Sequence, residues 1–254
     1  MLRSPITCIR NGLVGWWPVR HYQDMTSTAG QMIILPQNGA PTPTAGPSTR
    51  APGIKFNSSS DFYCTTQLYP ILAIPGDVTV CFWFATTATG TFQCFVGEAE
   101  ASGGGNNTYC VTLNFGSAGK VQFWGSAAGP DFGTATTGLN DGLWRHIAVS
   151  RSGGTSGRIY LNGKLDNTGT TQVGNTTALS VHRFAINQFG GFNGYRFAWS
   201  GADIRVYNRV LSDAEVAAIY GEAFLPEGIF WPGIDALGWI PPSPGKTLMG
   251  QIWM

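Results

Sequence analysis

The stretch WRHIAVSRSGGTSGRIYLNGKL, residues 144–165, contains short strand-like segments and the strongest turn signal in the chain. Ile147 and Val149 lie two positions apart, which is the spacing of side chains on one face of a strand. Asn162 and Gly163 separate two further strand-like segments, and both residues tolerate the positive φ angles of a type I′ turn. We therefore predict a β-hairpin that turns at this Asn-Gly pair.

An apolar segment with the sequence VTVCFWF lies upstream, at residues 78–84. Its side chains alternate between two faces, as they do in a strand, and both faces are largely apolar. We therefore predict a central strand. Another alternating segment begins at Lys120, and strands at this spacing with turn residues between them predict a sandwich or jelly roll. One face of the apolar segment carries Val78, Val80, Phe82 and Phe84.

The composition fits a single all-β domain with few charges. The chain has 254 residues, 35 of them glycine, and only 11% are charged, against a usual value of about 25%. The formal net charge is +1, and the sequence has neither a basic stripe nor a polybasic patch. We therefore expect no nucleic-acid partner and no membrane partner. So weak a charge suits a subunit held in an assembly.

The cysteines and the N-terminal residues bear on the compartment. We expect no export by the general route, because the N-terminal segment 1–11 and the residues after it contain no long apolar run. The number of cysteines is odd and none forms a CxxC pair, which indicates buried free thiols in a reducing compartment. The cysteines are Cys8, Cys64, Cys81, Cys94 and Cys110.

Two segments interrupt the strand pattern. Residues 26–53 contain five prolines among Gly, Thr and Ser, and we predict a long surface loop there. Near the end of the chain, Ser212 and Glu215 have the spacing of a capping box, and Gly221 stands where helices often stop. These signals predict one short helix of about two turns near residues 213–220.

Several segments, in this order, resemble a known family. Among them, the order WRHIAV, then Y-x-N-G, then FNG, then IRVYNRVLSDAE is the most specific feature. The chain resembles a concanavalin A-like, laminin-G-type (LamG) jelly-roll domain, of the kind found in bacteriophage structural proteins. The segments are GLVGWWPV (12–19), GIKFNSSSDFYC (53–64), VTVCFWF (78–84), WRHIAVSRSGGTSGRIYLNGKL (144–165) and FNGYRFAWSGADIRVYNRVLSDAEVAAIYGEA (192–223).

The resemblance implies an all-β fold, a two-sheet antiparallel jelly-roll sandwich over residues 12–223. It also implies that Trp144 and the helix at LSDAE are structural signatures. The acidic residue that the family carries before its last strand corresponds to Asp203. Because this fold supports lectins, glycosidases, adhesion modules and viral coat components, the resemblance leaves the activity open.

Glu98 and Glu100 are the closest match to a glycosidase pair of carboxylates. Their spacing places both on one face of a strand, but Ala99 stands where that branch of the family has a third acidic residue. No serine or cysteine nucleophile lies in an elbow motif. We therefore predict a protein that is not an enzyme and has no catalytic residues. We interpret His146, beside Trp144, as structural.

Calcium binding needs several oxygen ligands that converge on one point. No run of residues resembles such a ligand loop, and Asn140-Asp141-Gly142 is explained more simply as a turn. We therefore expect no cofactor and no metal site, with calcium left open. The available oxygen ligands are Asp131, Asn140, Asp141, Asp166 and Asp203.

Carbohydrate binding is a further expectation, without an assigned site. It requires exposed aromatic rings with amide or carboxylate groups nearby. Four aromatic residues lie near Asn and Gly residues and are candidates: Trp124, Phe189, Phe192 and Trp199.

The last thirty-one residues, 224–254, form an apolar arm rich in proline and tryptophan. The prolines exclude one long helix, so we predict an extended C-terminal arm. Such an arm must be covered by another surface, either its own sandwich or a neighbouring subunit, and we favour the neighbouring subunit. The residues predicted to bind the partner are Phe230, Trp231, Trp239 and Trp253.

These expectations favour a non-enzymatic virion structural protein, made in the host cytoplasm. It would be a capsid-decorating, head-fibre or tail-associated subunit, anchored by the C-terminal arm to capsid or tail proteins. We expect a homo-oligomer, with host surface glycans as candidate ligands of the sandwich. The alternative is a secreted carbohydrate-binding lectin module. A second alternative is a glycoside hydrolase of the same fold.

Overall fold

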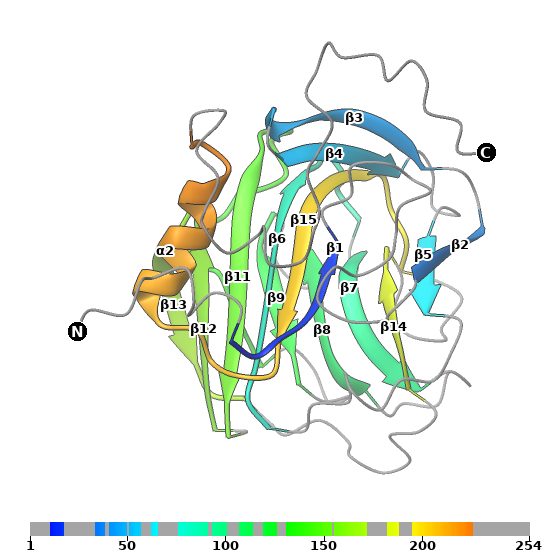
Figure 1. Cartoon of the computed structure of the whole chain (residues 1–254). Coiled ribbons are helices and arrows are strands. Elements are labelled where there is room, and N and C mark those ends of the chain that lie inside the picture. The colour runs from blue at the N-terminus through cyan, green and yellow to red at the C-terminus, as the bar shows by residue number, and fades with distance from the viewer. Residues whose placement is uncertain are drawn as a thin grey trace, which may run out of the picture.

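A computed structural model shows the arrangement of most strands of the chain. It describes residues 11–17, 34–38, 41–49, 51–56, 62–65, 76–90, 93–100, 107–113, 119–125, 131–153, 155–171, 182–187 and 195–225. Within these ranges the chain forms fifteen strands and one helix. The strands make two antiparallel sheets that lie face to face (Figure 1).

The first sheet has β6 and β15 at its centre and contains eight of the described strands. β1 (Leu13–Trp17) pairs with the second half of β15, on the edge where β4 pairs with the first half. The other seven, in spatial order, are β13 (Lys164–Gly169), β12 (Ser156–Leu161), β11 (Arg145–Ser152), β6 (Val78–Ala85), β15 (Trp199–Tyr207), β4 (Ala51–Phe56) and β3 (Thr42–Ser48).

The second sheet contains seven described strands and has β7 at its centre. The helix, α2 (Asp213–Glu222), lies beside the first sheet, away from the second (Figure 1). In spatial order the strands are β10 (Phe132–Gly133), β9 (Val121–Trp124), β8 (Asn107–Leu113), β7 (Gln93–Glu100), β14 (His182–Ile186), β5 (Phe62–Thr65) and β2 (Ile34–Asn38).

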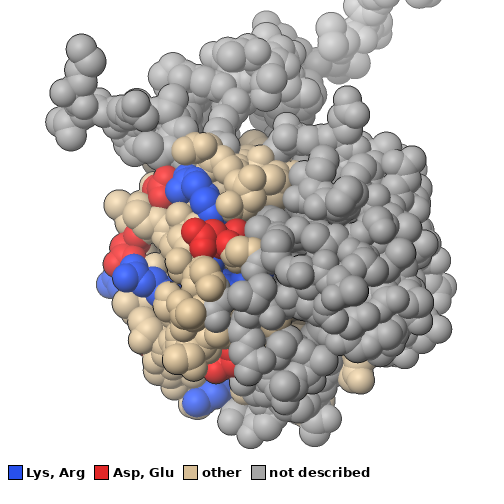
Figure 2. Space-filling model, turned by 90° about the horizontal axis from the view of Figure 1, so that it is seen from below, with Lys and Arg blue, Asp and Glu red and all other residues tan. Residues whose placement is uncertain are grey.

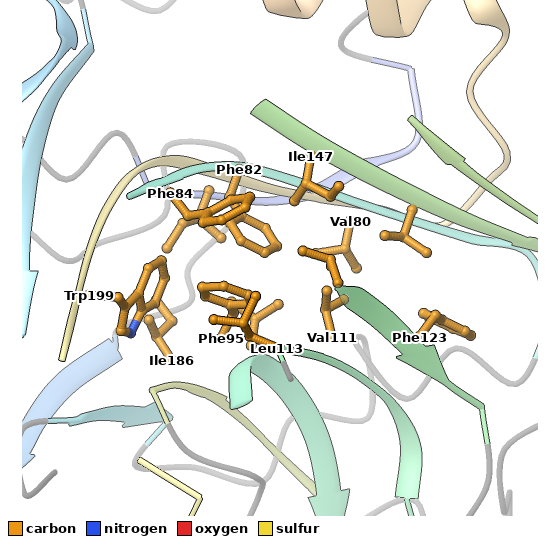
Figure 3. Close-up of a cluster of buried hydrophobic side chains, with 14 of the residues drawn as sticks. Val80, Phe82, Phe84, Phe95, Val111, Leu113, Phe123, Ile147, Ile186 and Trp199 are labelled. Atoms are coloured by element: carbon orange, nitrogen blue, oxygen red, sulfur yellow. The ribbon is translucent and has the colours of Figure 1, made fainter. Parts of the chain in front are cut away.

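The core between the sheets confirms the alternation predicted for residues 78–84. Figure 3 shows Val80, Phe82 and Phe84 pointing from β6 toward side chains of the second sheet. Phe82 and Phe84 contact Phe95 of β7, with ring centroids 5.3 and 4.8 Å apart. β6 has β11 and β15 as neighbours, so the prediction of a central strand is also confirmed.

The hairpin predicted at Asn162-Gly163 joins β12 to β13. Both residues adopt positive φ, 51° and 77°, as a type I′ turn requires. Asn162 also makes the turn part of the sheet, because its Oδ1 accepts a hydrogen bond from the backbone N–H of His146 at 2.9 Å. The residues that define the hairpin therefore also attach it to β11.

The prediction of a long loop over residues 26–53 is wrong where the structure describes that segment. β2, β3 and the start of β4 occupy residues 34–38, 42–48 and 51–53. β2 and β3 each stand at the edge of their sheets among the described strands. Proline is tolerated on edge strands, because its missing N–H can face away from the ladder. Pro36, Pro43 and Pro47 therefore lie on edge strands, whereas Pro52 lies in β4, opposite an irregularity in its pairing with β3.

The predicted helix is confirmed, with its capping box intact. The Ser212 hydroxyl accepts a hydrogen bond from the Glu215 N–H, and the Glu215 carboxylate accepts one from the Ser212 N–H. The helix continues through Gly221 to Glu222 and ends at Ala223 in a right-handed conformation. It therefore lacks the glycine C-cap that the sequence indicated. The carboxylate of Glu222, in the last turn, accepts a hydrogen bond from Arg205.

α2 covers apolar side chains on the outer face of the first sheet. Val216 and Ile219 of the helix are buried there with Leu211, which precedes its cap. The sheet contributes Cys81, Ala148, Tyr160 and Tyr207 to the same cluster. The N-terminal segment up to residue 10 and the arm beyond Leu225 lie outside the described residues.

Candidate binding site

Three connections between the two sheets lie side by side at one end of the sandwich. They join β6 to β7, β10 to β11 and β14 to β15. β6 is flanked by β11 and β15 in the first sheet, and β7 is paired with β14 in the second, so the connections are neighbours. We call their described residues, 86–90, 134–144 and 195–198, the loop rim. In Figure 1 the rim lies at the ends opposite the arrowheads of β7 and β15.

Hydrogen bonds join the three connections of the loop rim. The N–H of Gly142 donates to the carbonyl of Thr86 at 2.9 Å, and the Asn140 amide donates to the carbonyl of Ala88 at 2.9 Å. On the other side, the Thr86 hydroxyl donates to the carbonyl of Ala198 at 2.8 Å. The middle connection is therefore bonded to both of its neighbours, which makes the rim one surface.

Asn187 and Tyr195 fix the third connection at its two described ends. The Oδ1 of Asn187, which is buried, accepts from the Phe197 N–H at 3.0 Å and from the Trp199 indole at 3.1 Å. The Tyr195 carbonyl accepts from the Cys94 N–H at 2.8 Å. Tyr195 has a φ of 62°, which is uncommon for a bulky residue and persists only where its surroundings impose it.

The side chain of Tyr195 is 45% exposed. It is therefore an aromatic ring held at the surface by a backbone that is bonded on both sides. Such a ring offers an apolar face for stacking and a hydroxyl for hydrogen bonding. Exposed hydroxyl side chains lie on the other two connections, at Thr87, Thr89, Thr136 and Thr137. The combination has the chemistry of a carbohydrate-binding surface.

The aromatic residues proposed from the sequence do not form this surface. Trp199 is buried in the core, where it stacks on Phe56 with ring centroids 5.1 Å apart. Trp124 is only 8% exposed. Both expectations are wrong: Trp199 belongs to the core between the sheets, and Trp124 is covered on the other face of the second sheet, where it pairs with Cys110. Phe189 and Phe192 lie outside the described residues.

Sequence reasoning missed Tyr195, although a signal was present. Tyr195 follows Asn-Gly in the segment FNGYR, and Asn-Gly pairs mark tight turns. An aromatic residue directly after such a turn is a candidate for exposure. The hydrogen bond to Cys94 on β7, which positions Tyr195, joins residues far apart in the chain and is visible only in the structure.

The carboxylates that were available as calcium ligands are dispersed. Asp131 accepts from the Gly125 N–H at 3.1 Å, and Asp141 accepts from the Leu143 N–H at 3.0 Å. Asp166 accepts from the backbone N–H groups of Ala135 and Thr136. In the part of the chain that the structure describes, no group of three or more His, Cys, Asp and Glu side chains is placed to hold a metal ion.

Asp203, the fourth carboxylate available as a calcium ligand, lies within β15. The expectation that this acidic residue precedes the last strand is therefore wrong. It sits at a register shift of the strand with a φ of 49°. Its carboxylate accepts from the Trp16 indole at 2.6 Å and from Arg205 at 3.0 and 2.8 Å. Arg205 also pairs with Glu222 of α2 at 2.6 Å. Asp203 therefore connects β1, β15 and the helix.

This charged cluster is structural and largely buried. The side chains of Asp203 and Arg205 are 12% and 6% exposed. Burial lowers the pKa of Arg205, but the attraction of Asp203 and Glu222 outweighs it, so the pKa stays well above its usual value. Arg205 also lies over the Trp16 ring, 4.8 Å from its centroid. Arg205 therefore keeps its charge between the two carboxylates.

Glu98 and Glu100, the carboxylates considered for glycosidase chemistry, lie in β7. They pair with Phe184 and His182 of β14, so the backbone has the strand geometry that the spacing predicted. Their side chains lie outside the described residues.

His146 lies on the outer face of the first sheet, as its structural interpretation requires. It is 1% exposed and makes an edge contact with Trp83, with ring centroids 5.2 Å apart. Burial lowers the pKa of His146 to about 3. The imidazole is therefore neutral at working pH.

The described part of the C-terminal arm begins on the same outer face. Phe224 is 54% exposed, and its ring lies 5.6 Å from Trp83 and 5.3 Å from Tyr220, centroid to centroid. The predicted partner-binding residues Phe230, Trp231, Trp239 and Trp253 lie outside the described residues.

The charged surface shows side chains of both signs together. On the face in Figure 2, the Lys and Arg side chains that are described lie beside Asp or Glu. Arg158 pairs with Asp213 at 3.0 Å, and Arg209 pairs with Glu215 at 2.7 Å. Within the described ranges, no helix has the length and apolar character needed to cross a membrane.

Comparisons with known proteins agree with this architecture. The family model described as the concanavalin A-like lectin/glucanases superfamily (Laminin_G_3) matches residues 57–217, more than half of the chain. No curated protein sequence matches significantly.

Among solved structures, three binding domains illustrate the likeness. The botulinum neurotoxin serotype D ligand-binding domain, in complex with N-acetylneuraminic acid, has a TM-score of 0.63 at 12% identity, over 87% of this chain and 53% of that one. The binding domain of Paraclostridial Mosquitocidal Protein 1 gives 0.62 at 14%, over 85% and 53%. Domain 4 of AbnA, an extracellular arabinanase from Geobacillus stearothermophilus in complex with arabinotriose, gives 0.60 at 15%, over 82% and 98%.

The two toxin domains are longer than this chain, which spans about half of their length. At these identities the likeness establishes the fold, a concanavalin A-like jelly roll whose described residues form two antiparallel sheets and one short helix.

Proposed function

Because the chain belongs to the concanavalin A-like lectin/glucanases superfamily, we propose that it is a non-catalytic module that binds carbohydrate at the loop rim. The observation that carries the proposal is Tyr195, an exposed ring on a backbone fixed in a left-handed conformation. Two of the similar solved structures are complexes with sugars, N-acetylneuraminic acid and arabinotriose. The proposal transfers that class of ligand to this chain.

The loop rim suits an uncharged or weakly charged sugar. Stacking on the Tyr195 ring would bury the apolar face of a pyranose or furanose, and the exposed threonine hydroxyls would exchange hydrogen bonds with its hydroxyl groups. Asp141 on the rim already pairs with Arg145 and bonds the Leu143 N–H. Its charge is therefore compensated, and the other charged side chain among the described residues of the rim is Arg196, partly buried next to Tyr195.

Tyr195→Ala tests this proposal. We expect the variant to bind its glycan at least tenfold more weakly, a loss of about 1.4 kcal/mol or more, because the stacking surface is removed. A glycan array identifies the ligand, and isothermal titration calorimetry measures the affinity. Leu165→Ala is the matched control, because Leu165 is 46% exposed on β13, outside the loop rim.

Unchanged glycan affinity in Tyr195→Ala would contradict the proposal that the loop rim binds the glycan. An equal loss of affinity in Leu165→Ala would contradict it as well. Mass spectrometry of the glycan after incubation tests the hydrolase alternative at the same time. A binding module returns the glycan unchanged, whereas a glycosidase acting through Glu98 or Glu100 shortens it.

The finer proposal places this module on a virus particle, as a subunit anchored by the C-terminal arm. Two features of the arm support this proposal. Phe224, at its start, is exposed and its ring contacts Trp83 and Tyr220. The residues that follow Phe224 in the sequence are apolar and rich in proline. An arm of this composition needs a covering surface, and symmetric assemblies supply one between copies.

Removal of residues 226–254, which retains Phe224, tests the anchor. We expect the truncated protein to keep its melting temperature and to lose its oligomeric state, measured by light scattering, and its incorporation into particles. If the truncated protein forms the same oligomers as the full chain, the anchor proposal fails while glycan binding at the rim remains testable on its own.

A further inference from the structure

Two cysteines lie on adjacent central strands of the second sheet. Cys94 belongs to β7 and Cys110 to β8. Cys94 pairs across the ladder with Thr112, and Cys110 lies two residues from Thr112 along β8. Because side chains two apart share a face, the two thiols are on the same face of the sheet. Phe95 and Val111, their chain neighbours, point into the main core.

The two thiols are in contact with each other. Cys94 and Cys110 are diagonal neighbours across the ladder, at a place where the register of β7 against β8 shifts, between Cys94 and Val96. The Cys94 and Cys110 side chains hydrogen-bond to each other. Both residues are fully buried. The sulfur atoms are therefore already neighbours before any bond forms between them.

The third described cysteine has different surroundings. Cys81 is buried on the outer face of the first sheet, among Ala148, Tyr160 and residues of α2. All three are free thiols, as the sequence predicted for the cysteines. Cys81 therefore provides a matched control, a thiol that is equally buried on the opposite sheet.

We propose that Cys94 and Cys110 form a disulfide, a covalent link between β7 and β8, when the chain folds in the presence of a low-molecular-weight disulfide such as glutathione disulfide. The Cys94 thiolate attacks one sulfur of glutathione disulfide and releases one glutathione thiolate. The Cys110 thiolate then attacks the Cys94 sulfur of this mixed disulfide and releases the second glutathione. The two cysteines lose two protons and two electrons, and glutathione disulfide is reduced to two glutathione molecules.

Burial determines when this exchange can occur. Burial raises the pKa of the Cys110 thiol, and the hydrogen bond with Cys94 raises it further, so little of the reactive thiolate exists in the folded protein. The sulfurs are also closed to solvent. The disulfide therefore forms during folding, and once formed it is protected from reduction in the folded state. A chain folded in a reducing compartment keeps both thiols.

Refolding of the full chain from denaturant tests the proposal. One sample refolds in a mixture of reduced and oxidised glutathione and the other in a phosphine reductant. Free thiols are then alkylated, and peptides are mapped by mass spectrometry. We expect a linked peptide pair containing Cys94 and Cys110 in the first sample only. The bond closes a loop of roughly 15 residues, and we expect it to raise the melting temperature on the order of 5–10 °C.

Three variants separate this pair from the other cysteines. Cys94→Ala and Cys110→Ala should each remove the glutathione-dependent rise in melting temperature, whereas Cys81→Ala should retain it. A substitution that lowers stability by itself does not interfere, because each variant is compared with its own reduced sample. Alkylation of both Cys94 and Cys110 in the protein refolded with glutathione disulfide would overturn the proposal. A disulfide that joins either one to another cysteine would overturn it as well.

Discussion

Protonation of His146 links the stability of the sandwich to pH. The pKa of His146 is about 3 in the folded protein, against an ordinary value of 6.5. Between these values the unfolded chain binds a proton that the folded chain does not. The stability contributed by neutral His146 is therefore complete above pH 6.5 and is lost as the pH falls from 6.5 towards 3, by up to about 1.4 kcal/mol per pH unit.

His146→Phe should remove this dependence. We expect the wild-type protein to lose about 2 kcal/mol more unfolding free energy than the variant between pH 7 and pH 5, measured by urea denaturation. The variant should also be no less stable at pH 7, because neither ring nitrogen of His146 has a hydrogen-bond partner among the described residues. Identical losses in both proteins would show that His146 is accessible to protons in the folded state.

Asp203 is the residue whose removal should damage the first sheet most. In Asp203→Ala, Arg205 loses two hydrogen bonds and Trp16 loses one, and a buried charge is left with only Glu222. We expect a loss of about 3 kcal/mol, measured by chemical denaturation. Arg158→Ala is the control, because Arg158 forms an exposed ion pair with Asp213 worth at most about 1 kcal/mol, and its removal leaves the Tyr160–Asp213 hydrogen bond in place. Similar losses in the two variants would contradict the structural role of Asp203.

The hairpin between β12 and β13 depends on Gly163 for two separable reasons. Gly163 has a φ of 77°, and a Cβ there would lie 3.0 Å from the Cβ of Tyr220 in α2. Gly138 has a similar φ of 70° but open space around it. We expect Gly138→Ala to cost about 1 kcal/mol through backbone strain alone and Gly163→Ala about 2 kcal/mol or more, measured by thermal denaturation. Equal losses of stability in the two variants would mean that contact with α2 adds nothing to the cost of a side chain at Gly163.

Strands and the helix were predictable where a local pattern determines them. Alternation identified β6, the Asn-Gly pair identified the β12–β13 turn, and the capping box identified α2. The strands between residues 34 and 53 were not predictable, because proline content normally argues against a strand. Whether a proline is tolerated depends on whether its position must donate a hydrogen bond to a neighbouring strand, and strand order and pairing are properties of the whole fold.

At the scale of the whole molecule, the order of the motifs predicted the jelly roll. The loop rim, in contrast, could be recognised only in the three-dimensional structure. The rim combines connections from both sheets, and its contacts, such as Thr86 with Ala198, join residues far apart in the chain. Trp199 and Trp124 resembled binding residues because aromatic residues near Asn and Gly are common in both cores and sites. Only their burial separates them from Tyr195.

A crystal structure of the protein with its preferred oligosaccharide, chosen from a glycan array, tests the central claim most directly. The proposed function predicts a sugar ring stacked on Tyr195, with its hydroxyl groups bonded to side chains of residues 86–90 or 134–144. A sugar bound elsewhere on the sandwich, with Tyr195 uncovered, would contradict it.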